Sequence, residues 1–160
     1  VDRKFDTDKL RIGKTLKWNT IGVALYSYVV VYTGALVRHT DSSLICSDWP
    51  LCRNDQFTLP TNMYEWVQMG HRTAAAFIFL WIAGIAWHAF KHYKDQKVLY
   101  YGWIIAFIIV TLQATTGMLV VLTKLNLFIA LLHSLLISLL FGLLCYMILL
   151  LSRSRSKMTK

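Results

Sequence analysis

Two histidines, His71 and His133, lie inside long apolar runs of the sequence. An ionisable side chain is costly inside a membrane, so a residue of this kind is by default a candidate for function. His71 lies 20 residues before Lys91, and His133 lies 20 residues before Arg153, and these basic residues end the two runs. At 1.5 Å per helical residue, both imidazoles are expected roughly 30 Å from the same membrane surface.

Equal depth would let the two imidazoles share one ligand, because the two runs are expected to cross in the same direction. Neutral imidazole is a common metal ligand, and haem iron accepts a histidine on each face. His71 and His133 are therefore predicted to be the axial ligands of a haem iron. The alternative is two separate histidines, each hydrogen-bonded within the bundle.

A haem also needs room between helices and cations for its propionate groups. Gly34 and Gly117 would let helices or a flat ligand approach closely, although glycine is also ordinary in membrane helices. Arg72, next to His71, is predicted to pair with a propionate, and Arg38 is a second candidate. The alternative for Arg72 is that its long side chain reaches the outer membrane interface.

Three other polar residues carry weaker predictions. His88 follows His71 by 17 residues, about 25 Å along a helix, so it is excluded from the same iron. Glu65 is a candidate for proton transfer, but a solvated acid at a helix start is the stronger interpretation. Gln113 is expected to form a helix–helix hydrogen bond rather than to bind a ligand. No phosphate-binding glycine loop and no nucleophile triad is present in the sequence.

These residues must be positioned by membrane-spanning elements. The chain is 56% hydrophobic and only 16% charged, whereas soluble domains carry about a quarter charged residues. Each long apolar run reaches the roughly 20 residues that cross a bilayer, and such a segment must be helical to satisfy its own backbone. We expect an all-α, polytopic, antiparallel four-helix membrane bundle, a single domain over residues 1–160, with spans at about 18–37, 62–90, 99–123 and 126–152.

The net charge of +9 is explained by topology rather than by a nucleic-acid partner, which we do not expect. Thirteen Lys and Arg residues flank the spans on the side of the two termini, and three lie on the opposite side. Basic residues mark the cytoplasmic side, so both termini are expected there and the long loop after the first span outside. No cleavable signal peptide is recognised, and the first residue is Val1, so we expect a fragment or a processed product.

The long outer loop holds two of the three cysteines, Cys46 and Cys52. The outer compartment permits disulfides, and five intervening residues would close a small loop, so a disulfide is predicted. Two free thiols or a metal site are the alternatives. Cys145 is expected to be an inert residue inside the fourth span.

A short internal repeat precedes each of the two histidines. Thr33-Gly-Ala-Leu-Val37 ends the first span, and Thr116-Gly-Met-Leu-Val120 lies near the end of the third. The repeat would make the bundle two related helical hairpins. Five matching positions in apolar sequence also arise by chance.

Four segments together resemble a known family: Tyr32-Thr-Gly-Ala-Leu-Val-Arg-His-Thr40, Cys46-Ser-Asp-Trp-Pro-Leu-Cys52, Glu65-Trp-Val-Gln-Met-Gly-His-Arg72 and Leu132-His133-Ser134. They are similar to the C-terminal half of haem A synthase of the Bacillus type. The resemblance implies an enzyme with two four-helix halves that oxidises a ring methyl of haem O to the formyl group of haem A. It also implies that His71 and His133 hold a haem b cofactor and that Cys46 and Cys52 are the paired loop cysteines.

The chain departs from that family in length, because only one half is present. The resemblance places the substrate haem O and the acidic residue of the chemistry in the missing N-terminal half. We therefore expect this chain to bind haem b and relay electrons in a bacterial cell membrane, but not to make haem A alone. Its expected partners are that N-terminal half, membrane lipid and haem O synthase. The alternatives are a stand-alone bis-histidine b-type cytochrome and a haem-free membrane assembly protein.

Overall fold

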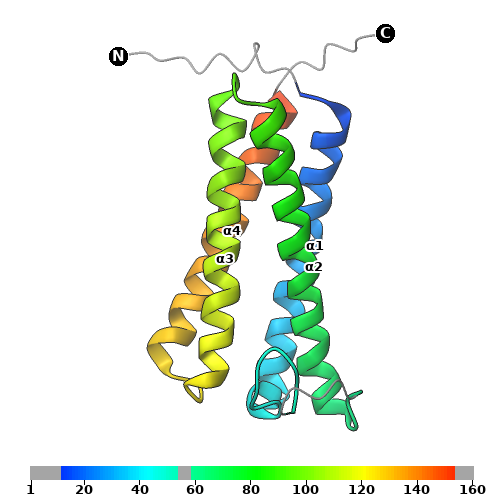
Figure 1. The fold of residues 1–160 in the computed structure, drawn as a ribbon, viewed down its shortest axis with the longest axis vertical. Helices are drawn as coiled ribbons and strands as arrows, with labels where there is room; N and C mark the ends of the chain where they lie inside the picture. The colour runs from blue at the N-terminus through cyan, green and yellow to red at the C-terminus, as the bar shows by residue number, and fades with distance from the viewer. Residues whose placement is uncertain (1–11, 54–58, 154–160) are drawn as a thin grey trace.

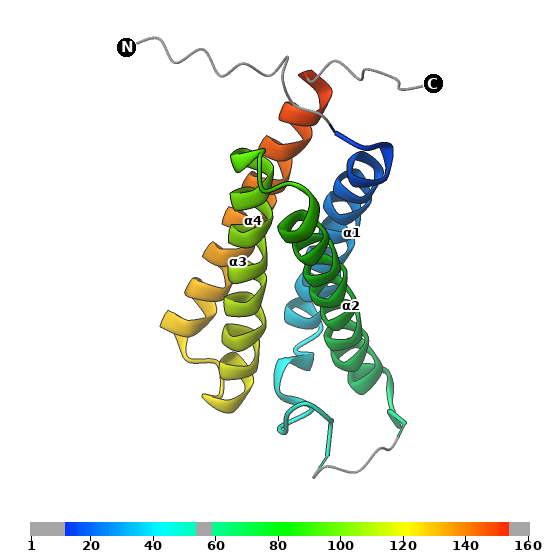
Figure 2. The same cartoon turned by 45° about the horizontal axis from the view of Figure 1, so that its top comes forward.

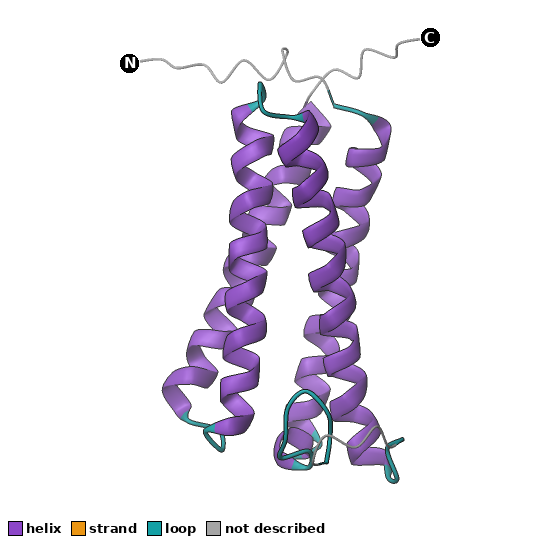
Figure 3. Cartoon of the chain, viewed as in Figure 1, coloured by secondary structure: helices purple, strands orange, loops and turns teal. Residues whose placement is uncertain are grey.

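The computed structural model describes residues 12–53 and 59–153. Four long helices and one short 3-10 helix make up the described secondary structure, with no strand in that part of the chain (Figures 1 and 3). Their bounds are α1 Lys14–His39, η2 Ser42–Leu44, α2 Met63–His92, α3 Lys97–Leu122 and α4 Leu127–Arg153. The helices contain the predicted spans apart from single residues at three ends, positions 62, 123 and 126.

The long helices alternate in direction and form an antiparallel bundle (Figure 1). The start of α1, the α2–α3 connection and the end of α4 lie together at one end, which we call the terminal end. The α1–α2 connection and the α3–α4 turn lie at the other, which we call the loop end. Each of the four helices is long and apolar enough to cross a membrane. The predicted fold class, an all-α polytopic membrane protein, is confirmed.

Local hydrogen bonds fix where the helices begin at the loop end. Asn62 caps α2 by accepting from the backbone N–H of Glu65 at 3.0 Å. Asn126 accepts from the N–H groups of Phe128 and Ile129 and so caps the first turn of α4. Side-chain oxygens are favoured at such positions because the first N–H groups of a helix have no partner within it.

The cluster of buried apolar residues that all four helices share, here called the shared core, lies in the half of the bundle nearer the terminal end. Toward the loop end, the cluster of buried apolar residues stops at one residue on each helix: Val30, Ile78, Val110 and Leu140. His71 lies seven residues before Ile78, and His133 lies seven residues before Leu140. Both histidines thus lie about two helical turns beyond the shared core. The ribbons of the α1–α2 and α3–α4 hairpins diverge in this half (Figures 1 and 2).

The predicted disulfide between Cys46 and Cys52 is present in the α1–α2 connection. Both cysteines are buried, although the segment lies at the end of the bundle. Cys145, the third cysteine of the chain, is free and half-buried in α4.

Cysteine alkylation tests this arrangement directly. Denatured, unreduced protein should take up one alkyl group, at Cys145, because the other two thiols are joined. Reduction before alkylation should raise the count to three. Intact-mass measurement reads both values, and uptake of three groups without reductant would exclude the disulfide.

Candidate functional site

The side chain of His71 is held by the neighbouring helix α1. Its Nδ1 lies 3.0 Å from the hydroxyl of Thr33. That hydroxyl donates its single proton to the carbonyl of Val30 at 2.8 Å, so it can only accept from the imidazole. The proton of neutral His71 therefore lies on Nδ1, and the lone pair lies on Nε2.

The side chain of His133 is held in the same way by α3. Its Nδ1 lies 3.1 Å from the hydroxyl of Thr116 and 3.1 Å from the carbonyl of Gln113. The Thr116 hydroxyl itself donates toward the backbone carbonyls one turn earlier in α3. A carbonyl can only accept, so the proton of neutral His133 also lies on Nδ1 and leaves Nε2 as an acceptor.

A glycine makes room for each of these imidazole rings. A Cβ atom on Gly34 would lie 3.0 Å from Cε1 of His71, and one on Gly117 would lie 3.1 Å from Cε1 of His133. Both distances are tighter than ordinary carbon–carbon contacts, at about 3.5–4.0 Å, so a side chain here would push the ring away. The close approach that we expected at these glycines is made by the histidine rings.

The structure gives the internal repeat a physical meaning. In each hairpin, a Thr-Gly pair on the first helix contacts the histidine of the second, the threonine through Nδ1 and the glycine through the ring. Each histidine is therefore held by a Thr-Gly pair on the preceding helix, in the half of the bundle beyond the shared core. We call each of these Thr-Gly-His arrangements an imidazole mount.

Gln113 forms the helix–helix hydrogen bond that we expected. Its side-chain Nε2 lies 3.2 Å from Nε2 of His133 on α4. Because that imidazole nitrogen carries a lone pair, the amide is the donor. Its other atom, Oε1, is buried and has no hydrogen-bond partner among the described residues.

Arg72 lies on α2, and its side chain is buried against the loop that carries the disulfide. Its guanidinium donates at 2.8–3.2 Å to four backbone carbonyls of this loop, those of Cys46, Asp48, Pro50 and Leu51. Its Cζ also lies 5.2 Å from the ring centre of Trp49. All of these partners belong to the loop, and the pairing of Arg72 with a haem propionate stays a prediction.

Gln68, one turn before Arg72, is a residue of the site that the sequence did not single out. Its Oε1 accepts from the N–H of Cys46 at 2.7 Å, and its Nε2 donates to the carbonyl of Ser43 at 2.8 Å. The spacing of Gln68 and Arg72, four residues on one face of α2, is the signal that could have indicated a shared role. Together they fasten the disulfide loop to the helix that carries His71.

Glu65 is a buried cap rather than the solvated acid that the sequence favoured, and its side chain is only 4% exposed. It pairs with Arg53 and accepts from the backbone N–H of Thr61 at 2.8 Å. With Asn62 it forms a reciprocal cap at the start of α2, as expected for an acid near the positive end of a helix. A role of Glu65 in proton transfer stays a prediction.

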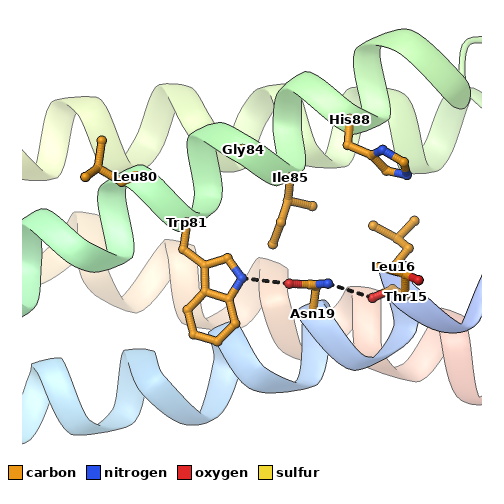
Figure 4. Close-up of a pocket in the computed structure, with 8 residues that line it drawn as sticks. All are labelled: Thr15, Leu16, Asn19, Leu80, Trp81, Gly84, Ile85 and His88. Atoms are coloured by element: carbon orange, nitrogen blue, oxygen red, sulfur yellow. Dashed lines mark hydrogen bonds between the residues drawn. The ribbon is translucent and has the colours of Figure 1, made fainter.

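The remaining candidates lie apart from the imidazole pair. Arg38 is exposed in the last turn of α1. His88 lines a groove between α1 and α2 toward the terminal end, where Trp81 donates to Asn19 at 2.8 Å and joins the two helices (Figure 4). Its ring lies 4.6 Å from that of His92, at the same end of α2.

Replacing Arg72 with methionine should loosen the disulfide loop. The change removes the donors to four carbonyls, and we expect a loss of about 2–4 kcal/mol in the free energy of unfolding. Denaturant unfolding in detergent, with limited proteolysis of residues 43–53, measures the effect. The exposed Arg38→Met is the matched control and should cost less than about 0.5 kcal/mol. Equal effects of the two variants would contradict the anchoring role.

Comparison with known proteins identifies the family. A family model described as COX15-CtaA, cytochrome oxidase assembly protein, matches residues 54–145. A protein named heme A synthase from Lysinibacillus sphaericus is 72% identical over 155 residues, which cover 96% of this chain and 50% of that protein. Proteins with the same name from Macrococcus caseolyticus and Geobacillus kaustophilus are 55% and 53% identical, each over 97% of this chain and 52% and 49% of their own lengths.

The chain thus spans about half the length of the curated relatives that it matches. The resemblance seen in its motifs is confirmed, and the family model covers more than half of its residues. The chain belongs to the COX15-CtaA family of cytochrome oxidase assembly proteins.

Proposed function

We propose that this chain is the haem b-binding half of a haem A synthase, an oxidoreductase that converts the ring methyl of haem O to the formyl group of haem A. The observation that carries the proposal is the pair of imidazoles whose Nδ1 protons are engaged by threonines. Nε2 of each ring then keeps the lone pair that an iron ligand needs. His71 and His133 are the residues that would hold the haem iron.

The described residues fit a haem better than a bare metal ion. Among residues 12–53 and 59–153, no group of three or more His, Cys, Asp or Glu could hold a metal ion. A haem iron needs only two protein ligands because the porphyrin supplies the other four.

The threonine hydroxyls do more than select a tautomer. A hydrogen bond to the far nitrogen of a ligating histidine fixes the ring orientation and raises its basicity. Thr33 and Thr116 would supply this bond, while Gly34 and Gly117 set how closely each ring lies to the adjacent helix. When bound, haem b supplies reversible one-electron chemistry, and these side chains hold it in place.

The chain spans about half the length of the relatives that it matches, which supports an enzyme of two halves. We propose that an N-terminal half binds haem O and carries the oxidation, so this half alone is inactive. In this arrangement the protein lies in the bacterial cell membrane with both termini cytoplasmic and the disulfide loop outside. Haem O synthase is a further proposed partner.

Alanine substitution of either histidine tests the ligand pair. The purified wild-type chain should show a low-spin haem b spectrum, because two imidazoles give a strong axial field. His71→Ala and His133→Ala should each remove that spectrum and reduce haem content. His88→Ala, on the same helix as His71, is the control and should leave it unchanged. A low-spin spectrum that survives either ligand substitution would overturn the assignment, and no haem in the wild type would favour a haem-free assembly protein.

Co-expression separates half of a synthase from a stand-alone cytochrome. Expressed with the N-terminal half of the Lysinibacillus sphaericus relative, in cells that make haem O, the chain should yield haem A. The matched control is the same pair with His71→Ala in this chain. Pigment extraction and chromatography measure the product. Haem b binding without haem A in the paired cells would favour the stand-alone cytochrome.

A further inference from the structure

The two imidazole mounts are matched at the threonine, the glycine and the histidine, but they differ three residues before the threonine. That position is Val30 in α1 and Gln113 in α3. In both hairpins its backbone carbonyl accepts from the threonine hydroxyl, at 2.8 Å for Val30 and 3.1 Å for Gln113. Its side chain is apolar in one hairpin and an amide in the other. Only the amide reaches the imidazole, at Nε2 of His133.

The direction of this hydrogen bond follows from its surroundings. Nδ1 of His133 faces a carbonyl and a threonine hydroxyl that already donates elsewhere, so Nδ1 must carry the proton. Only the amide nitrogen of Gln113 can then donate to Nε2. This orientation leaves Oε1 buried without a partner among the described residues. A buried carbonyl oxygen in that state is unfavourable, so the amide is held by its bond to the imidazole at a cost.

We propose that Gln113 is a placeholder for the iron at His133. Its amide caps the Nε2 lone pair of His133 and would have to release that nitrogen for His133 to hold a haem iron. The exchange would cost one hydrogen bond and involve no electron transfer. The inference rests on the proposed function, because it takes His133 as an axial ligand.

The placeholder makes His71 and His133 differ in whether Nε2 already has a hydrogen-bond partner. Among the described residues, no hydrogen bond to Nε2 of His71 is found, and the matching Val30 side chain has none to offer. His71 would therefore hold a haem iron without the displacement of a side chain, whereas His133 would do so only after Gln113 moves away from Nε2. The affinity for haem would be lowered by the net free energy of one neutral hydrogen bond, the one between the amide and His133.

Removal of the Gln113 amide should increase the affinity for haem, although most substitutions near a binding site reduce affinity. Gln113→Val copies the other hairpin, and Gln113→Leu keeps more of the volume. Both should bind ferric haem b more tightly than the wild type, by about three- to tenfold, because nothing must leave His133. The full haem-free chain is titrated with ferric haem b, and the low-spin Soret band reports binding at both nitrogens. The neighbouring Thr115→Val, whose exposed hydroxyl bonds only within α3, is the control and should bind as the wild type does.

A second measurement needs no substitution and no haem. Diethyl pyrocarbonate acylates neutral imidazole, and the capped His133 should react more slowly than His71 in the haem-free wild type. Peptide mass analysis gives the two rates. Equal rates, or a faster His133, would overturn the placeholder, as would Gln113 variants that bind haem no more tightly than the wild type. If the wild type takes up no haem, it is the proposed function that fails, whereas the acylation rates still decide whether Gln113 caps His133.

Discussion

The site depends on two threonine hydroxyls, each of which donates its only proton to a backbone carbonyl of its own helix. Thr33 donates to the carbonyl of Val30 in its own helix, so it can meet His71 only as an acceptor. Thr116 is bound in the same way in α3 and meets His133 likewise. A helix backbone thereby determines the tautomer of an imidazole on the next helix. Without this constraint each ring could turn its protonated nitrogen inward, and no lone pair would be presented for a ligand.

The rest of the bundle holds the helices that carry these hydrogen bonds in place. A shared apolar core joins all four helices toward the terminal end, and it stops two turns before the histidines. At the loop end, Gln68 and Arg72 tie the disulfide loop to α2, next to His71 in the chain. The imidazole of His71 is thus held between a packed core and a fastened loop. The α3–α4 hairpin has only a short turn at that end, so the mounting of His133 relies more on α3 itself.

The sequence was sufficient for the fold class, because hydropathy and charge depend on residue type alone. It was not sufficient for the partners of Arg72 or Glu65. Both predictions assumed that a charge near a membrane seeks lipid, water or ligand, whereas the loop supplies backbone carbonyls to Arg72 and a buried ion pair to Glu65. Such contacts depend on how a connection folds back, which has no periodic pattern to read. The Thr-Gly repeat was visible, but its role required the three-dimensional pairing of each threonine with a histidine.

The two hairpins also differ at the position three residues before the threonine, which is Val30 in α1 and Gln113 in α3. Two identical imidazole mounts would present two equivalent Nε2 atoms, and a ligand could bind either atom first. An amide at position 113 and valine at position 30 remove that equivalence while leaving both threonines and both glycines in place. The buried Oε1 of this amide has no hydrogen-bond partner among the described residues, which is unfavourable for a carbonyl oxygen. If the two histidines hold a haem as proposed, one polar side chain is enough to make them differ, because Nε2 of His133 has an amide partner and Nε2 of His71 has none among the described residues.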